Sequence, residues 1–352
     1  MTVTRALRSG AWRVVELLTT PLVPADYLDT VAPLRNADVL RARIVAVRPE
    51  TADSVTLVLR PGRGWHPHEP GQYVRLGVDV DGVRLWRAYS VTCAPGQLSV
   101  TVNAVRDGVV SNHLIRNARP GMILHLDNPA GDFTLGLPRP ERALFVTAGS
   151  GITPVMGMLR SALHELGDVV VVHSAPERDA VVFGAELRGI AADGRIRLIE
   201  RHTRADGRIT PAELAELVPD LFERQAWACG PNEMLDELGV YWAEAGAMEL
   251  LHIERFRPVV VAAGDGGKVI FARSCSVVDA AGDVPILEAG EAAGVLMPSG
   301  CRMGICFGCV LPMTEGAVRD LRDGSITTAV EGDNVLVQTC VSAAAGRCRL
   351  DV

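Results

Sequence analysis

Four cysteines near the C-terminus are the residues whose spacing points most directly to chemistry. Cys301, Cys306 and Cys309 follow one another with gaps of four and two residues, and Cys340 lies beyond a gap of thirty. Two irons need two thiolates each, and this is the plant-type spacing of a [2Fe–2S] cluster. Buried structural cysteines or a zinc site are the alternatives, but zinc sites more often use two Cys-x-x-Cys pairs and only one close pair is present. The spacing therefore predicts a one-electron carrier.

A cation, an aromatic ring and a hydroxyl stand together at 87–90, where the sequence reads R-A-Y-S. In an extended strand Arg87 and Tyr89 share one face, and Ser90 turns to the other. Further along, 108–111 reads G-V-V-S, a glycine turn that leads into a short predicted helix over 112–117 with Ser111 as its N-cap. Free N–H groups at a helix start attract anions. Taken singly, both segments would equally fit ordinary residues at the rim of a barrel.

Two further segments follow predicted parallel strands. Gly149–Pro154 (G-S-G-I-T-P) comes after an apolar run and opens a helix, where a pyrophosphate would lie on amide donors. It lacks the third glycine of G-x-G-x-x-G, so it is not the usual dinucleotide fingerprint. Cys229, Gly230 and Pro231 end another such strand, at the edge where ligands bind in open α/β sheets. A small buried cysteine is the alternative for Cys229.

Composition narrows the class of protein. A chain of 352 residues is too long for one ordinary core and indicates two or three domains. A net charge of −7 argues against nucleic-acid binding, which favours a basic face. The other four cysteines show no pairing pattern, so we expect a reducing cytoplasm rather than a disulfide framework. No uncharged apolar run approaches the length of a membrane span, and charged residues interrupt any signal peptide.

The pattern of apolar and turn residues divides the chain into five segments. Residues 1–37 are hard to classify, and a packing extension is favoured over a membrane- or partner-docking segment. Six short β-branched runs separated by turn residues predict a small antiparallel barrel over 38–138. Apolar strands that alternate with helices predict a doubly wound parallel sheet over 139–256. A glycine-rich linker, 257–267, leads to a last segment, 268–352, with a hairpin, a helix and the cysteine loop.

These motifs, in this order, resemble the ferredoxin–NADP reductase superfamily, and within it the members that carry a C-terminal plant-type ferredoxin domain. The resemblance covers about 38–352. It implies a flavin-binding antiparallel six-stranded β-barrel, an α/β nicotinamide-nucleotide domain and a C-terminal β-grasp ferredoxin domain. The N-terminal wording and G-C-R-M-G-I-C-F-G-C are also similar to actinobacterial reductases that serve membrane desaturases or alkane hydroxylases.

The resemblance also assigns roles to residues. Arg87 would pair with the flavin pyrophosphate, Tyr89 would lie along the isoalloxazine, and Ser90 would hydrogen-bond near N5. A phosphate cradle after the first set implies FAD, since the related FMN branch lacks it. Thr153 would lie near the flavin, Cys229 near the nicotinamide C4, and Phe256 over one of the two rings. The flavin-binding set is Arg87, Ala88, Tyr89, Ser90, Gly108, Val109, Val110 and Ser111. The nicotinamide-nucleotide set is Gly149, Gly151, Ile152, Thr153, Pro154, Cys229, Gly230, Pro231 and Phe256. The cluster ligands would be Cys301, Cys306, Cys309 and Cys340, and the catalytic residues Ser90, Thr153 and Cys229.

The choice between NADPH and NADH depends on the end of the second parallel strand. A carboxylate there binds a free ribose 2′-hydroxyl, whereas cations and hydroxyls take a 2′-phosphate. Ser174 and Arg178, with help from Arg204, favour the phosphate and therefore NADPH. Ala175 and Glu177 argue the other way. Phosphate-binding relatives often have arginine directly after the serine, where this chain has Ala175, and Glu177 is itself a carboxylate.

The predicted enzyme is an NAD(P)H-dependent oxidoreductase that passes electrons through FAD and the cluster to an oxygen-activating partner. That partner would be a desaturase, an alkane hydroxylase or a ring oxygenase, with any membrane contact made through it. Two alternatives stay open: a reductase of another redox protein, such as a flavohaem-like or hybrid-cluster partner, and a β-grasp adapter without catalysis. The segment 265–352 carries eleven acidic and seven basic side chains, so its net charge of −4 would steer a basic partner surface.

Overall fold

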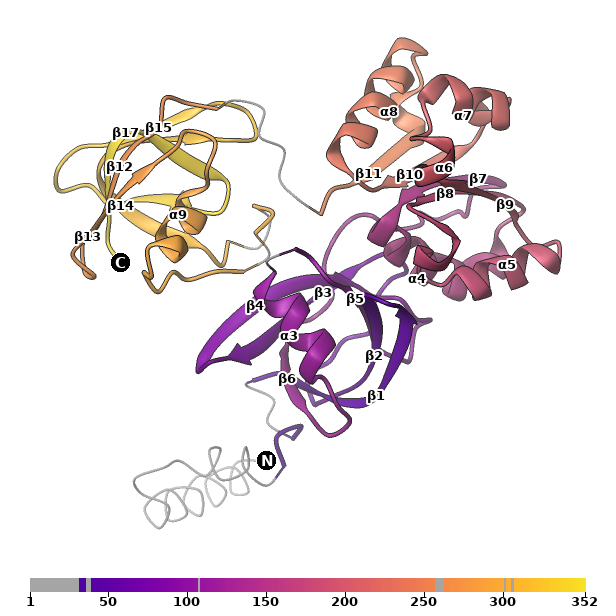
Figure 1. The fold of residues 1–352 in the computed structure, drawn as a ribbon, viewed down its shortest axis with the longest axis horizontal. Helices are drawn as coiled ribbons and strands as arrows, with labels where there is room; N and C mark the ends of the chain where they lie inside the picture. The colour runs from indigo at the N-terminus through magenta and orange to yellow at the C-terminus, as the bar shows by residue number, and fades with distance from the viewer. Residues whose placement is uncertain (1–31, 36–38, 107, 257–262, 301, 305–306) are drawn as a thin grey trace, which may run out of the picture.

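The computed structural model describes residues 32–35, 39–106, 108–256, 263–300, 302–304 and 307–352. Their strands form three sheets, which follow one another along the chain (Figure 1). The predicted extension over 1–37 lies almost wholly outside the described residues. So do Cys301, Cys306 and most of the predicted linker. Among the described residues, no helix is both long and apolar enough to cross a membrane.

The first sheet is the predicted six-stranded antiparallel barrel. Its strands are β1 (Arg41–Thr51), β2 (Ser54–Pro61), β3 (Tyr73–Val80), β4 (Val83–Ser90), β5 (Ser99–Asn103) and β6 (Ile123–Leu126), in the order β4-β3-β6-β1-β2-β5. A bridge between Val91 and Val100 joins the end of β4 to β5. Alternate side chains such as Ile44 and Leu76 are fully buried and form one core. Helix α3 (Val109–Asn117) packs against β3, β4 and β5.

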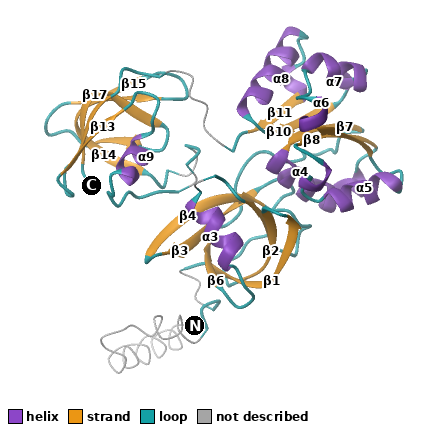
Figure 2. Ribbon diagram, viewed as in Figure 1, coloured by secondary structure: helices purple, strands orange, loops and turns teal. Residues whose placement is uncertain are grey.

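The second sheet is parallel throughout, as the apolar runs predict. Its strands are β7 (Arg142–Ala148), β8 (Asp168–Ala175), β9 (Arg197–His202), β10 (Gln225–Cys229) and β11 (Leu251–Glu254), in the order β11-β10-β7-β8-β9. Both faces are covered: α4 (Ile152–Ala162) and α5 (Gly184–Ala192) bury one, and α7 (Pro211–Leu217) and α8 (Asn232–Glu244) bury the other (Figure 2). A short helix, α6 (Thr203–Asp206), follows β9. Because all five strands run the same way, their carboxyl ends meet at one edge.

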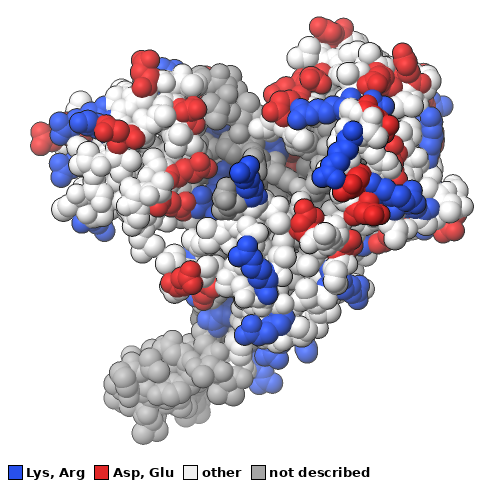
Figure 3. Space-filling view, viewed as in Figure 1, with Lys and Arg blue, Asp and Glu red and all other residues white. Residues whose placement is uncertain are grey.

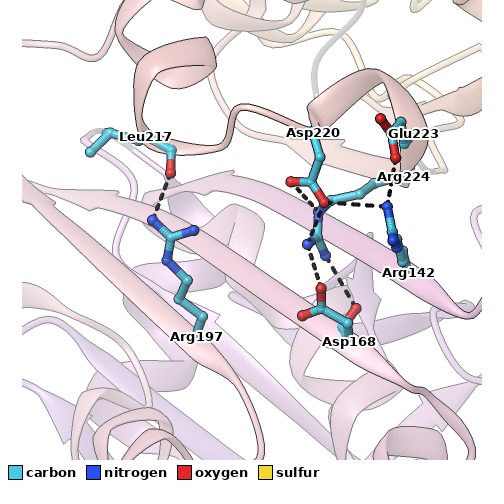
Figure 4. A network of polar contacts seen from close by, with 7 residues as sticks. All are labelled: Arg142, Asp168, Arg197, Leu217, Asp220, Glu223 and Arg224. Atoms are coloured by element: carbon cyan, nitrogen blue, oxygen red, sulfur yellow. Dashed lines mark hydrogen bonds and ion pairs between the residues drawn. The ribbon is translucent and has the colours of Figure 1, made fainter.

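The opposite edge of this sheet is held by ion pairs. The Arg224 guanidinium, only 5% exposed, lies 2.5 Å from Asp168 Oδ2 and 2.8 Å from Asp220 Oδ2 (Figure 4). Arg142 reaches Glu223 at 2.6 Å in the same network. These contacts tie the start of β8 to the turn before β10, and they lie far along the strands from the carboxyl edge. Their role is structural.

The third sheet belongs to the C-terminal segment and contains a parallel pair inside an otherwise antiparallel sheet. It consists of β12 (Gly267–Phe271), β13 (Ser276–Ala280), β14 (Val310–Asp320), β15 (Ile326–Ala329), β16 (Val335–Gln338) and β17 (Ser342–Leu350), and α9 (Ile286–Ala292) packs on it. Strands β12 and β17 are the parallel pair, although one starts the segment and the other ends it. A helix laid across such a mixed sheet is the expected β-grasp arrangement.

The barrel and the parallel sheet meet closely along α4. A Cβ on Gly157 would stand 2.2 Å from the carbonyl oxygen of Val91, so only glycine allows this approach. Arg160 donates to the Thr92 carbonyl at 2.5 Å and also pairs with Glu186 of α5. Since Val91 and Thr92 directly follow β4, this contact holds the R-A-Y-S segment against the domain that contains G-S-G-I-T-P.

Candidate flavin, nucleotide and cluster sites

The R-A-Y-S segment forms the last four residues of β4, paired with β3. Ser90 is 5% exposed, and its hydroxyl has no hydrogen-bond partner among the described residues. Burial raises the pKa of Tyr89, so the phenol stays neutral. Desolvation, and secondarily the nearby Arg302, lowers the pKa of Arg87 to about 10, which leaves a cation at neutral pH. A buried hydroxyl without a partner and a partly buried cation, three residues apart on one strand, are groups that a polar ligand would satisfy.

The second flavin segment differs from the prediction at one point. Helix α3 begins at Val109 with Gly108 as its N-cap, so the expectation that Ser111 caps a helix over 112–117 is wrong. A Cβ on Gly108 would stand 2.6 Å from Ser111 Oγ, and this tight turn lets the helix start earlier. Ser111 instead lies in the first turn, where its Oγ accepts from the Val105 amide at 3.3 Å. The free amides of that turn therefore belong to 109–111, within the predicted cradle.

Packing of α3 against β4 brings the two flavin segments to the same part of the barrel. The orphan hydroxyl of Ser90, the Arg87 cation and the amides at the start of α3 are the donor set that a flavin with a pyrophosphate requires. The residues present therefore fit FAD.

The G-S-G-I-T-P segment lies at the carboxyl end of β7, where a short 3₁₀ turn (Gly149–Gly151) leads into α4. Gly149 has a φ of +55°, the left-handed region that glycine adopts without strain. A Cβ on Gly151 would stand 2.0 Å from the Cys229 carbonyl oxygen. The turn thus rests directly on the C-G-P segment, and Thr153 fixes it through a 2.9 Å bond from its Oγ1 to the Ser150 carbonyl. Two predicted segments that are far apart in the sequence, G-S-G-I-T-P and C-G-P, therefore lie in contact.

A row of polar side chains that sequence reasoning missed crosses the carboxyl ends of the strands. Strand register places Cys229 beside both Thr147 and Glu254, Thr147 beside His173, and His173 beside Glu200. Thr147 Oγ1 and His173 Nδ1 lie 2.8 Å apart. The available signal was that apolar strands end in a polar residue, but only strand pairing shows that these ends adjoin.

Burial dominates the electrostatics of this row. It raises the pKa of Glu254 to about 8 and, with Glu254 nearby, raises that of the Cys229 thiol. It lowers the pKa of His173 to about 4, with His202 contributing. Glu254 Oε2 and His173 Nε2 have no hydrogen-bond partner among the described residues. At neutral pH the buried row therefore holds a neutral thiol, a neutral imidazole and a largely protonated carboxyl beside the nucleotide turn. Phe256, partly buried, packs against the same core two residues after Glu254.

The three residues expected at a ribose 2′-phosphate lie around the ends of β8 and β9. The Ser174 hydroxyl is buried without a hydrogen-bond partner among the described residues. Arg178 Nη1 lies 4.0 Å from Glu200, which Arg188 also contacts at 3.0 Å. Arg204 pairs with Glu177 at 2.8 Å. Each predicted phosphate cation therefore already faces a carboxylate, a feature that the sequence did not reveal.

Two of the four predicted cluster ligands are described. Cys309 and Cys340 are 1% and 3% exposed and belong to the same core. Thr339 Oγ1 donates to the Cys309 carbonyl at 2.9 Å and ties the two neighbourhoods together. In the described part of this loop, 302–304 and 307–309, Arg302, Gly304 and Phe307 have positive φ. Arg322 and Gln338 donate to the Gly304 carbonyl. Positive φ at a non-glycine residue is uncommon and indicates a conformation held by its surroundings. The two described thiols fit a cluster held at this loop.

Comparison with protein families matches all three parts of the chain. Residues 66–135 match the oxidoreductase FAD-binding domain, 145–238 the oxidoreductase NAD-binding domain, and 271–345 the 2Fe-2S iron–sulfur cluster binding domain. The FAD, nicotinamide-nucleotide and [2Fe–2S] predictions are thereby confirmed.

Individual relatives agree with this assignment. A Mycobacterium tuberculosis protein named NADPH oxidoreductase is 47% identical over the whole chain and 95% of its own length. The ferredoxin reductase component of 3-ketosteroid-9-alpha-monooxygenase from Mycolicibacterium smegmatis is 30% identical over 80% of this chain and 87% of its own. Among solved structures, phthalate dioxygenase reductase has the same fold, with a TM-score of 0.60, 21% identity, and 89% and 98% of the two chains covered. The chain belongs to the ferredoxin–NADP reductase family of NAD(P)H-dependent oxidoreductases, in the form that carries a C-terminal [2Fe–2S] ferredoxin domain.

Proposed function

We propose that this protein is the reductase component of an oxygenase system: it takes electrons from NADPH, passes them through FAD and the cluster, and delivers them to an oxygen-activating partner. The observation that carries the proposal is the contact between the G-S-G-I-T-P turn and Cys229, held against β4 by α4. That contact brings the nucleotide and flavin segments together. The flavin, when bound, accepts two electrons and releases them singly to the cluster.

The flavin is held by two sets of residues. Arg87 and the amides of 109–111 bind the pyrophosphate, where a cation and a helix start both favour negative charge. Tyr89, neutral and half-buried, would lie along the ring, and the Ser90 hydroxyl, which has no partner among the described residues, would hydrogen-bond to it near N5. Ala88 and Gly108 leave room for close backbone approach.

The nicotinamide nucleotide is held on the other side of the same contact. The turn from Gly149 to Pro154 would bind its pyrophosphate, Thr153 would stand toward the flavin, and Cys229–Pro231 would line the nicotinamide. Phe256 covers a ring. Because Cys229 is fully buried and its pKa is raised, the thiol acts here as a neutral, compact wall that excludes water rather than as a nucleophile.

NADPH is favoured over NADH by the Ser174 hydroxyl and by Arg178 and Arg204. The carboxylates of Glu200 and Glu177 oppose this preference, so a 2′-phosphate would have to compete with them for the two arginines. Arg178 lies 4.0 Å from Glu200, whereas Arg204 lies 2.8 Å from Glu177, so Arg178 is the freer of the two to turn to a phosphate. The name of the M. tuberculosis relative supports the same choice.

The cluster would be held by Cys301, Cys306, Cys309 and Cys340. Electrons would pass from the cluster to the partner protein. A membrane desaturase or alkane hydroxylase and a soluble ring oxygenase are the candidate recipients. Relatives named as reductase components of monooxygenases support an oxygenase as the class.

Reconstituted turnover tests this proposal. Purified protein with bound FAD and cluster would be combined with candidate oxygenases encoded alongside it, and NADPH-dependent substrate oxidation would be measured. We expect turnover that requires both proteins. Rapid reduction of cytochrome c with no oxygenase turnover from any candidate would instead assign it to another redox partner.

A further inference from the structure

One end of the barrel carries exposed arginines that form no ion pair with the residues that the structure describes. We call it the basic end; it consists of Arg35, Arg43, Arg60, Arg63 and Arg119. Arg43 of β1 lies directly opposite Arg60 of β2. The amide of Arg63 donates to the Leu34 carbonyl, which brings in the turn at 32–35. In Figure 3, blue side chains gather without red ones at the lower end of the barrel.

This arrangement has a cost that the fold does not offset. Like charges directly opposite on neighbouring strands destabilise a sheet. None of the five arginines forms an ion pair with another described residue, whereas Arg75 and Arg84, also on the barrel, pair with Asp127 and Asp79. The segment 38–138 holds eleven arginines and nine acidic side chains, a net of +2 in a chain whose total is −7. Positive charge is thus concentrated in this domain and left unpaired at one end.

Apolar side chains accompany the charge. Val39 and Val45, which lie within four residues of Arg43 in the sequence, are 37% and 45% exposed. An acidic protein surface would match the charge alone, whereas an anionic lipid surface matches both the charge and the apolar residues.

We propose that the basic end of the barrel rests on an anionic lipid surface and makes this reductase a peripheral membrane protein in its own right. The cofactor segments stay free in that position. Arg43 pairs with Ile123 of β6. Ser90 pairs with Tyr73, which in turn pairs with Ala130, seven residues after Ile123. The basic end therefore lies at the opposite end of the barrel from Ser90, and it points away from the two other sheets (Figure 1). This inference is independent of the terminal electron acceptor.

Vesicle co-sedimentation of the full-length holoprotein tests the proposal. Vesicles of phosphatidylcholine alone would be compared with vesicles of phosphatidylcholine and phosphatidylglycerol in equal parts, at low and high salt. The test variant is Arg43→Glu with Arg60→Glu. The matched control is Arg195→Glu with Arg347→Glu, which makes the same change of charge at exposed arginines in the other two sheets' domains. Absorption spectra and NADPH–ferricyanide activity would show that every variant retains its cofactors.

We expect binding to the anionic vesicles only, weakened by salt because surface charge is screened. The test variant should bind at least about 25-fold more weakly, since each arginine near an anionic surface contributes about fivefold. The control should bind as the unmodified protein does. No binding to anionic vesicles, or equal loss in both variants, would overturn the proposal. So would loss of oxygenase-coupled turnover in the test variant without any vesicle binding, which would assign the basic end to an acidic protein.

Discussion

Glu254 shows how one residue's environment decides its chemistry. It ends β11 beside Cys229, and burial raises its pKa to about 8. A carboxyl whose pKa is higher in the folded chain than in the unfolded one binds its proton more tightly when folded. Folding stability from this group is therefore full below the unfolded pKa of 4.5 and is lost as pH rises toward 8.

Glu254→Gln should remove that pH dependence. The unmodified protein should lose stability relative to the variant by at most about 1.4 kcal/mol for each pH unit between 4.5 and 8. Thermal melts of both holoproteins across this range would measure the difference in Tm. Parallel curves for the two proteins would show that Glu254 is ionised in the fold.

Arg178 carries the coenzyme preference in this account. Arg178→Ala should raise KM for NADPH about tenfold, equivalent to one lost charged hydrogen bond, and leave KM for NADH nearly unchanged. The matched control is Arg195→Ala, at an exposed arginine that precedes β9 and lies at the opposite end of that strand from Arg204. Equal effects of Arg178→Ala on both coenzymes would refute the 2′-phosphate assignment.

At the scale of elements, the turn from β7 into α4 does the positioning. It can rest on β10 only because Gly151 has no side chain, and the Thr153 hydroxyl closes it by donating to the Ser150 carbonyl. A shift of this turn would move the nucleotide relative to the flavin, and misplacement by about 1 Å can cost two orders of magnitude in rate.

Gly151→Ala should therefore reduce kcat/KM for NADPH oxidation by about a hundredfold, because its Cβ would collide with the Cys229 carbonyl. The spectra of the flavin and the cluster should not change. Gly189→Ala, in α5 with open space around it, is the control and should keep full activity. Normal kinetics in Gly151→Ala would mean that the turn does not set the nucleotide's position.

The parallel sheet and helix α3 show how much of the structure the sequence predicts. The apolar runs predicted the parallel sheet over 139–256, because strands buried on both faces read as continuous apolar segments. The start of α3 was wrong by three residues, since Ser111 looked like an N-cap while Gly108 makes the turn. The polar row from Glu254 to Glu200 could not be predicted, because five strand ends become neighbours only through the order β11-β10-β7-β8-β9. The carboxylates facing Arg178 and Arg204 were missed for the same reason.

In the whole molecule, each of the three domains binds one redox group. The flavin and nucleotide domains meet along α4, and the cluster belongs to the C-terminal domain. The influence of Arg302, in the cysteine loop, on the pKa of Arg87 indicates that the cluster loop lies near the flavin segment. Electrons entering at the nucleotide would then have to pass through the cluster to reach a one-electron protein acceptor.

Cys306→Ser tests this central claim most directly, with Cys275→Ser, at an exposed cysteine outside the cluster motif, as its control. NADPH oxidation would be measured with ferricyanide, which takes electrons from the flavin, and with cytochrome c, which takes them from the cluster. We expect Cys306→Ser to keep the ferricyanide rate and lose cytochrome c reduction, while Cys275→Ser keeps both. Undiminished cytochrome c reduction in Cys306→Ser would contradict it and show that the cluster is not the exit.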